Sequence, residues 1–253
     1  MAGRLTCPSS QPYDYVTRTR ALPVNLLFLM PWLLVYQLAL FFTRSPVDNA
    51  AAASIRTLVG ELGRNGSMLL TLGVAASLGA VVVIRAREAT QDRGVFGGML
   101  VEGLCYGALL GTVANLMATR LPMERWVELA ASTAAGDTML EMQVGIRDLG
   151  LAVGAGIFEE LIFRGVLLAG LHALLRYAVG TDRITAAVVS IVLSAYLFSD
   201  YHHWGLTGEP YDARIFAFRF HAGILLGAVY LYRGLGIAAF AHGFYDVLVM
   251  LGR

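Results

Sequence analysis

Three charged side chains interrupt an otherwise apolar segment of this chain. Residues 154–168 read GAGIFEELIFRGVLL and contain Glu159, Glu160 and Arg164. A charge at the centre of a bilayer costs about 2.5–3.5 kcal/mol on insertion scales, so such groups are retained where a partner or a polar cavity offsets the cost. The segment therefore predicts a functional site at membrane depth, and a cluster that only fixes helix packing is the alternative.

The spacing of these residues predicts different roles for the two carboxylates. Glu160 and Arg164 are four residues apart, so on a helix they share a face and can form an ion pair. The residue four positions after Glu159 is Phe163. A carboxyl group in apolar surroundings retains its proton more readily than in water, which suits general acid–base catalysis. We therefore expect a structural pair, Glu160–Arg164, beside a free carboxylate, Glu159.

Two later apolar segments carry histidines at the same four-residue spacing. Phe198 is followed by His202, and His242 is followed by Asp246. Peptide hydrolysis needs a nucleophilic water, a proton carrier and hydrogen-bond donors for the developing oxyanion. A carboxylate and two histidines around one water-filled cavity would supply all three.

Two further polar residues, Arg219 and His221, lie near the start of the apolar segment 213–232. We expect them either to bind a carboxylate of the substrate or to anchor this helix at the membrane interface. His203 follows His202, and neighbouring residues on a helix point about 100° apart. We therefore expect His202 in the cavity and His203 at the interface.

The composition indicates the fold class. The chain has 253 residues, of which 57% are hydrophobic and 15% are charged, whereas soluble domains contain about 25% charged residues. We predict an all-α polytopic membrane protein in which residues 1–253 form a single transmembrane domain with the active-site cavity inside the membrane. About seven spans are expected, at residues 21–43, 66–84, 98–119, 144–175, 184–199, 213–232 and 235–251.

Within this domain, residues 1–20 form a polar N-terminal segment, and residues 144–253 contain the polar motifs and form the expected catalytic core. The fourth span exceeds the ~20 residues that a membrane crossing needs. We therefore expect it to be tilted, to be broken at Gly165 or Gly170, or to be followed by a separate short helix from Leu167.

Small and acidic residues in two other spans predict packing contacts. Gly223 and Gly227 are spaced so that another helix can approach closely. Glu102 lies near the start of the third span, where we expect an interfacial or packing role rather than catalysis.

The charge distribution limits partners and location. A net charge of +1 gives no indication of a nucleic-acid partner. Slightly more arginines fall in the loops on the side of the N-terminus, which favours a cytoplasmic N-terminus. We expect a multi-pass protein of the cell membrane, in contact with the lipid bilayer. The short loops and the absence of lysine indicate a prokaryotic inner membrane.

Three motifs, taken in their order along the chain, resemble those of one family. They are EExxxR at residues 159–164, FxxxH at residues 198–202 and HxxxD at residues 242–246, each on an apolar segment. This arrangement is similar to the CAAX protease and bacteriocin-processing family. Its members are intramembrane glutamate-type endopeptidases and include the type II CAAX prenyl endopeptidases. The resemblance covers roughly residues 144–253.

The resemblance implies a role for each motif residue. Glu159 resembles the general base that activates the attacking water, and His202 resembles the histidine that helps to hold this water. His242 and Asp246 match the pair that stabilises the oxyanion, although many members have Asn at the last position. An ionised Asp only accepts hydrogen bonds, whereas Asn can donate. Asp246 is therefore expected either to be protonated or to orient His242.

The expected site also includes the Glu160–Arg164 pair, and a bound zinc ion is an alternative to catalysis without a metal. Glu160 and Arg164 resemble the supporting pair of the family. Two histidines and a carboxylate are also a known set of catalytic zinc ligands, so the alternative is a zinc ion held by Glu159, His202 and His242. The sequence has no HExxH motif, and we expect catalysis without a metal or another cofactor.

Three functions fit these residues. The favoured one is an intramembrane endopeptidase acting on a membrane-anchored protein or peptide. A proton-coupled membrane transporter could use the same carboxylates and histidines as a relay, but the sequence shows no inverted repeat. A non-catalytic membrane scaffold or immunity protein is the third, and it would need the Glu160–Arg164 pair but not Glu159.

Overall fold

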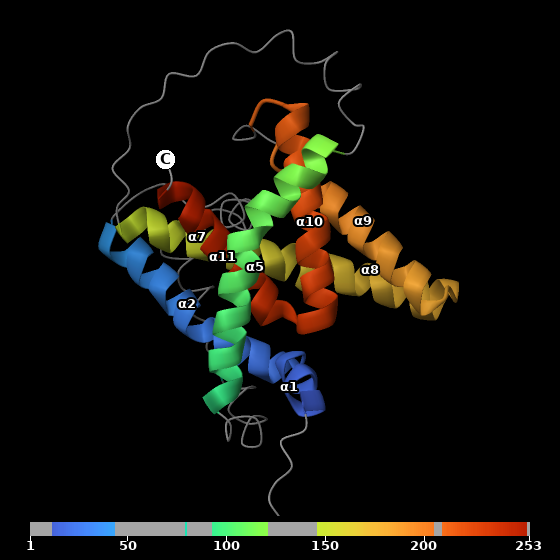
Figure 1. The fold of residues 1–253 in the computed structure, drawn as a ribbon, viewed down its shortest axis with the longest axis horizontal. Helices are drawn as coiled ribbons and strands as arrows, with labels where there is room; N and C mark the ends of the chain where they lie inside the picture. The colour runs from blue at the N-terminus through green and yellow to red at the C-terminus, as the bar shows by residue number, and fades with distance from the viewer. Residues whose placement is uncertain (1–11, 44–78, 80–92, 121–145, 205–208, 252–253) are drawn as a thin grey trace, which may run out of the picture.

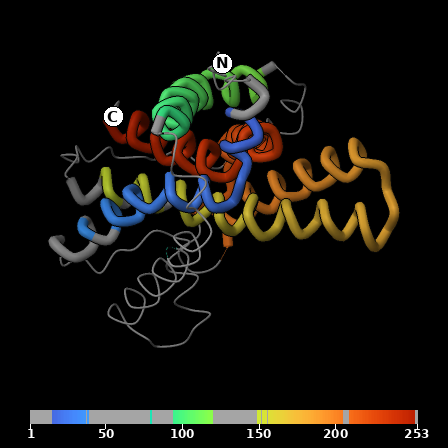
Figure 2. Tube along the Cα trace, turned by 90° about the horizontal axis from the view of Figure 1, so that it is seen from below, coloured from blue at the N-terminus to red at the C-terminus, as the bar shows by residue number. Residues whose placement is uncertain are grey.

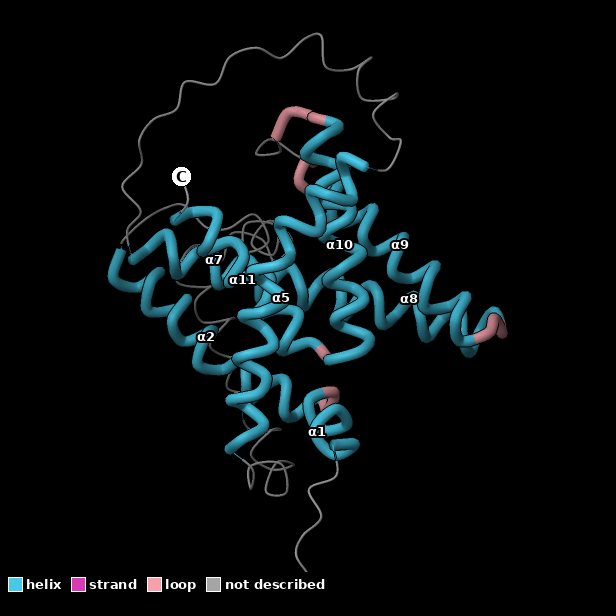
Figure 3. The backbone as a smooth tube through the Cα atoms, in the orientation of Figure 1, coloured by secondary structure: helices cyan, strands magenta, loops and turns pink. Residues whose placement is uncertain are grey.

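The computed structural model describes residues 12–43, 79, 93–120, 146–204 and 209–251. In this described part the secondary structure consists of helices joined by turns and loops, without a strand (Figure 3), which confirms the all-α fold class. The helices are α1 (Pro12–Thr19), α2 (Leu22–Thr43), α5 (Arg93–Arg120), α7 (Ile146–Glu160), η2 (Leu161–Leu168), α8 (Ala169–Ala173), η3 (Leu174–Val179), α9 (Arg183–Tyr201), α10 (Ala213–Arg233) and α11 (Leu235–Leu251).

Several of these helices are apolar along their length. Three of them are long and apolar enough to cross a membrane, at Gly94–Thr119, Arg183–Tyr201 and Ala213–Arg233, and two shorter apolar helices cover Leu22–Tyr36 and Leu235–Leu251. The chain therefore forms a helical membrane bundle. The expected second span, residues 66–84, lies outside the described residues apart from position 79.

Helix α11 forms the centre of the bundle. Its residues from Leu235 to Gly243 are all buried, and it packs against α2, α5, α7 and α10 (Figure 1). A helix that is apolar on all sides is stable when it is covered on all sides. His242 lies within this buried stretch, so it is held by packing on several neighbouring helices.

Residues 146–179 form one continuous helical rod made of α7, η2, α8 and η3 (Figure 2). Gly165 and Gly170 lie inside this rod, so the break expected at these glycines is not present. The rod instead accommodates its length with two π-helical stretches, η2 and η3, and π turns are frequent at functional sites. It ends at Gly180, whose φ of 81° is a left-handed conformation that glycine adopts without strain.

Helix α9 turns back along this rod (Figure 2) and then packs against α10. Asp182 begins α9 by accepting hydrogen bonds from the backbone amides of Ile184 and Thr185, at 2.9 and 3.0 Å. Such N-caps satisfy amides that have no partner within the helix. A Cβ atom added to Gly223 of α10 would lie 2.9 Å from the Cβ of Ala195, so this glycine permits the close approach that the sequence predicted.

Two polar contacts connect the N-terminal helices to the C-terminal half. The Nε and Nη2 atoms of Arg233 donate to the two carboxylate oxygens of Glu102 at 2.6 and 2.7 Å, joining α5 to α10. This ion pair agrees with the packing role expected for Glu102. Asn25 of α2 accepts a hydrogen bond from the amide of Gly236 at 2.6 Å. It thereby satisfies one of the first amides of α11, which have no partner within their own helix.

Candidate active site

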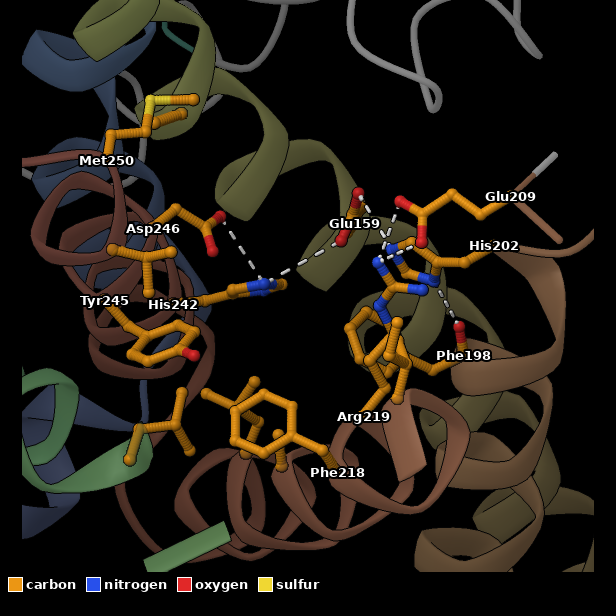
Figure 4. Close-up of a pocket in the computed structure, with 16 residues that line it drawn as sticks. Glu159, Phe198, His202, Glu209, Phe218, Arg219, His242, Tyr245, Asp246 and Met250 are labelled. Carbon is orange, nitrogen blue, oxygen red and sulfur yellow. Dashed lines mark hydrogen bonds and ion pairs between the residues drawn. The ribbon is translucent and has the colours of Figure 1, made fainter. Parts of the chain in front are cut away.

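A cavity of about 580 Å³ lies between helices α5, α7, α9, α10 and α11. The four residues predicted to be catalytic, Glu159, His202, His242 and Asp246, all line it (Figure 4). The other lining residues are mostly apolar or aromatic, with one further ion pair, and they are Leu110, Ala152, Phe198, Glu209, Ile215, Phe218, Arg219, Ala222, Leu226, Tyr245, Val249 and Met250. The structure thus brings together four predicted side chains that lie as far apart in the chain as residues 159 and 246.

Glu159 lies between the two histidine rings. Its Oε1 atom is 3.9 Å from Nε2 of His202, and its Oε2 atom is 3.8 Å from Nε2 of His242. Both distances exceed the range of a direct hydrogen bond. Polar atoms separated by this distance are commonly bridged by a water molecule. Each of the two distances therefore leaves room for a water molecule between Glu159 and one of the histidine rings.

The orientation of His202 follows from its contact with the chain four residues earlier. Its Nδ1 atom lies 2.8 Å from the carbonyl oxygen of Phe198. A carbonyl only accepts hydrogen bonds, so Nδ1 carries the hydrogen and donates it. In the neutral ring, Nε2 then presents a lone pair towards Glu159. The FxxxH spacing thus fixes both the tautomer and the direction of this ring.

The Glu160–Arg164 pair is present and has a second function. Oε1 of Glu160 lies 2.7 Å from Nη1 of Arg164, and both side chains are fully buried. The same oxygen lies 2.9 Å from Nδ1 of His242. Because a carboxylate paired with a guanidinium accepts hydrogen bonds, Nδ1 of His242 donates to it. Glu160 therefore holds the imidazole so that Nε2 faces the cavity.

Asp246 lies on the cavity side of the same ring. Its Oδ2 atom is 3.6 Å from Nε2 of His242, which is too long for a hydrogen bond. The residue that orients His242 is thus Glu160 rather than Asp246. Asp246 and Nε2 of His242 instead face one region of the cavity, where both can contact a ligand.

Arg164 connects the site to two further helices. Its Nη2 atom donates to the carbonyl oxygen of Gly223 at 3.2 Å, and its Cζ atom lies 4.6 Å from the ring centroid of Phe198. A guanidinium over an aromatic face is attracted by the ring electrons. Arg164 therefore contacts α9 and α10 as well as its own helix, and it offsets the charge of Glu160.

A contact between two glycines brings the carboxylates close to His242. A Cβ atom added to Gly156 of α7 would collide with the backbone nitrogen and Cα of Gly243 in α11. Gly156 precedes Glu160 by about one helical turn, and Gly243 follows His242 directly. Because no side chain separates the two backbones here, Glu160 and His242 reach hydrogen-bond distance. No pattern in the sequence distinguishes these two glycines from the other glycines of the chain.

The two residues predicted to bind substrate are placed differently. Arg219 lines the cavity and forms an ion pair with Glu209, with Nη2 at 3.0 and 2.9 Å from the two carboxylate oxygens. His221 is 2% exposed, and its Nδ1 atom donates to the carbonyl oxygen of Ala217 at 2.7 Å. Among the described residues, His221 is not part of the cavity lining, and its ring is bonded within its own helix.

Glu209 is the cavity residue of the site that the sequence reasoning missed. It belongs to the polar connection between α9 and α10, seven positions after His202. The signal that could have found it is an acidic residue in a short connection that begins directly after the histidine pair.

The donor set of Glu159, His202 and His242 was tested for zinc. Zinc binds these donors at about 2.1 Å in tetrahedral geometry, which requires neighbouring donor atoms about 3.4 Å apart. The separations here are 3.9 and 3.8 Å. In the described part of the chain, no group of three or more His, Cys, Asp or Glu residues has an arrangement that could hold a metal ion. The donors have the right chemistry for zinc, and their separations are longer than those around a bound zinc ion.

The fold and the site define a class, namely helical membrane proteins with a carboxylate–histidine cavity between their helices. Comparison with protein families then gives a match for the C-terminal part of the chain. Residues 146–248 match the family described as type II CAAX prenyl endopeptidase Rce1-like. The match covers the chain from α7 into α11, which contains all four predicted catalytic residues, and it confirms the resemblance predicted from the three motifs. This similarity indicates a membrane protease in general. Comparisons with curated proteins and with solved structures gave no match.

Proposed function

We propose that this protein is an intramembrane endopeptidase that hydrolyses a peptide bond of a membrane-associated protein or peptide. The observation that carries the proposal is the position of Glu159, with Nε2 of His202 and of His242 at 3.9 and 3.8 Å from its two carboxylate oxygens. A carboxylate and two imidazoles around one water supply a general base and two further hydrogen-bond partners. The similarity of residues 146–248 to a protease family supports the same reaction.

In the proposed reaction, Glu159 acts as the general base. It takes a proton from the bound water while the water oxygen attacks the carbonyl carbon of the scissile bond. Nε2 of His202 accepts the second hydrogen bond of this water and so fixes its direction of attack. When the tetrahedral intermediate collapses, the C–N bond breaks, and Glu159 passes its proton to the leaving nitrogen. The products are a carboxylic acid and an amine, and Glu159 is ionised again at the end of the reaction.

His242 and Asp246 stabilise the oxyanion that forms on the substrate carbonyl. Glu160 accepts the Nδ1 hydrogen of His242, and in the proposed reaction Nε2 carries a second proton. The resulting Nε2–H donates to the oxyanion. Asp246 donates in the same way when its carboxyl group is protonated. Hydrogen bonds to developing charge in a site with little water are among the strongest catalytic effects, worth about 2.7–4 kcal/mol for one donor.

The surroundings of the cavity support a substrate that approaches from the bilayer. Apolar and aromatic side chains form most of the lining, and the cavity lies between helices of a membrane bundle. We propose that the protein functions in the cell membrane and that the substrate is a membrane-anchored protein or peptide. No metal or other cofactor takes part in the proposed steps.

The proposal is tested by comparing membrane-protein termini in cells that make either the wild-type protein or the Glu159→Gln variant. Glutamine has nearly the same shape as glutamate but cannot accept the proton. We expect new N- and C-termini that appear with the wild type and are absent with the variant. Equal amounts of both proteins in the membrane, measured by quantitative blotting, serve as the control. Identical termini in both cell lines would contradict the protease function.

A further inference from the structure

We infer that Glu209 and Arg219 are positioning residues for His202, acting through the turn that follows α9. This inference rests on the proposed function, because it assigns a role to the environment of the histidine that holds the water. Three sets of contacts support it, involving the backbone of Glu209, its side chain and the helix that carries Arg219.

His202 lies just beyond the last residue of α9, Tyr201. Backbone carbonyl groups at the end of a helix have no amide partner within that helix. The carbonyl oxygen of His202 is instead satisfied by the backbone amide of Glu209, at 2.9 Å. The position of His202 therefore depends on a residue that belongs to the following connection, and not only on helix α9.

The carbonyl group of Glu209 is also engaged. The Nδ1 atom of His203 lies 3.1 Å from it and, because a carbonyl only accepts, donates the hydrogen. Both peptide groups of Glu209 are thus bonded to the His202–His203 turn. A displacement of Glu209 would move the backbone of His202 together with the ring that faces Glu159.

The side chain of Glu209 connects this turn to α10. Its carboxylate oxygens lie 3.0 and 2.9 Å from Nη2 of Arg219 (Figure 4). Helix α10 is in turn fixed to α9, because Oγ of Ser199 donates to the carbonyl oxygen of Phe216 at 2.7 Å. Arg219 therefore lies on a helix that is bonded to α9. Its ion pair with Glu209 keeps Glu209 next to the C-terminal end of α9.

The exposure of the Glu209–Arg219 pair indicates that it contributes little to the stability of the fold. The side chain of Glu209 is 52% exposed and that of Arg219 is 20% exposed. Exposed ion pairs contribute little to folding, because water screens their attraction. We therefore expect that loss of the pair leaves the bundle folded while it disturbs the geometry of His202. A misplacement of about 1 Å in a catalytic group can lower a rate about 100-fold.

A direct role of Arg219 in binding a substrate carboxylate makes the opposite kinetic prediction. If Arg219 were a receptor for substrate, then Glu209 would compete with the substrate, and Glu209→Gln would lower KM. A positioning pair instead predicts that Glu209→Gln and Arg219→Gln each lower kcat and leave KM nearly unchanged.

The kinetic test uses purified full-length protein and a quenched peptide that spans a cleavage site found by the comparison of termini. We expect kcat to fall about 10- to 100-fold in Glu209→Gln and in Arg219→Gln. The double variant should be no slower than either single variant, because both changes break one interaction. The charge-swapped protein, with Glu209→Arg and Arg219→Glu, should regain part of the lost kcat.

The matched control is Arg214→Gln. It removes the same charge from the same helix, and the exposed side chain of Arg214 is not part of the cavity lining in the described chain. Its kcat should equal that of the wild type. Unchanged kcat in Glu209→Gln, or a changed KM with constant kcat in Arg219→Gln, would overturn the inference. A wild type no faster than Glu159→Gln would instead contradict the proposed function.

A second readout needs no substrate. In protein with ¹⁵N-labelled histidine, the His202 signals can be assigned among the five histidines by their loss in His202→Gln. We expect these signals to shift or broaden in Glu209→Gln and in Arg219→Gln and to remain unchanged in Arg214→Gln. Unchanged His202 signals in both pair variants would overturn the inference, whatever the kinetic result.

Discussion

Nδ1 of His242 lies 2.9 Å from Oε1 of Glu160, although 82 positions separate the two residues in the chain. Glu160 is also the ion-pair partner of Arg164. One buried carboxylate thus links the supporting pair of the site to the imidazole that faces the cavity. Its neighbour Glu159 lines the cavity itself. The two adjacent glutamates therefore have different surroundings, and we expect different functions for them.

The first prediction concerns stability. Glu160→Ala or Arg164→Ala leaves an unpaired charge in a fully buried environment, because both side chains are 0% exposed. Breaking such a pair costs about 3–5 kcal/mol of folding free energy. Thermal unfolding in detergent should therefore show a clear loss of Tm for both variants.

The matched control for this prediction is Glu159→Gln. The nearest basic nitrogens, on the two histidines, lie at 3.9 and 3.8 Å, so the substitution breaks no ion pair at bonding distance. Its Tm should remain close to that of the wild type. If Glu159→Gln and Glu160→Ala lost equal stability, the division of roles between the two glutamates would be wrong.

The second prediction concerns the contact of α7 with α11. In Gly156→Ala, the added methyl group would collide with the backbone of Gly243. The helices must then move apart, which typically costs about 1–3 kcal/mol and lengthens the Glu160–His242 contact. We expect a lower Tm together with a lower kcat.

Gly165→Ala provides the comparison, since the nearest atom to the added Cβ lies 3.8 Å away. This substitution should be neutral or stabilise the helix by about 0.5–1 kcal/mol. Equal Tm and kcat for Gly156→Ala and the wild type would show that the close approach of the two backbones is not needed.

The third prediction concerns Asp246 and pH. If Asp246 donates a hydrogen bond to the oxyanion, it must be protonated, so activity falls as the pH rises and the carboxyl group ionises. An Asn side chain donates at every pH. Asp246→Asn should therefore retain activity and lose the part of the high-pH decline that Asp246 causes, while the part caused by loss of the Nε2 proton of His242 remains. Asp246→Ala should lower kcat about 100- to 1,000-fold.

The measurement is kcat as a function of pH for the three proteins. Glu159 and His242 also face this part of the cavity, so the decline at low pH, where Glu159 gains a proton and ceases to act as a base, should be common to all three. An inactive Asp246→Asn would indicate that the carboxylate form of Asp246 is required.

The fourth prediction concerns metal. We expect purified protein to cleave at the same rate before and after dialysis against a zinc chelator, because the proposed steps use Glu159 directly as the base. Metal content would be measured on the same samples. Loss of activity on chelation, recovery with zinc and one zinc ion per chain would contradict this and would favour the site of Glu159, His202 and His242.

The sequence predicted four residues that line the cavity because their spacing follows the helix. Residues four apart share a helix face, and both Phe198–His202 and Glu160–Arg164 make contacts that stay within one turn. The fold class and the grouping of these residues in one cavity are confirmed. The contact between Glu160 and His242 was not predicted, because it depends on how closely two distant helices pack.

Other features depended on backbone geometry that a sequence does not display. The rod formed by residues 146–179 contains π-helical stretches rather than a break at Gly165 or Gly170. The choice between a break and a wider turn depends on partners in neighbouring helices, such as Ser194, whose Oγ donates to the carbonyl oxygen of Phe163 at 2.7 Å. Glu209 was missed because its contact with His202 is a backbone hydrogen bond, which residue type and helical spacing do not reveal.

The most direct measurement is the rate of peptide cleavage by purified Glu159→Gln relative to the wild type, with equal Tm for the two proteins. Glu159 is proposed to take the proton of the attacking water, so we predict a fall in kcat of about 1,000-fold or more with KM nearly unchanged. A Glu159→Gln protein that cleaves at the rate of the wild type would contradict the role of Glu159 as the catalytic base.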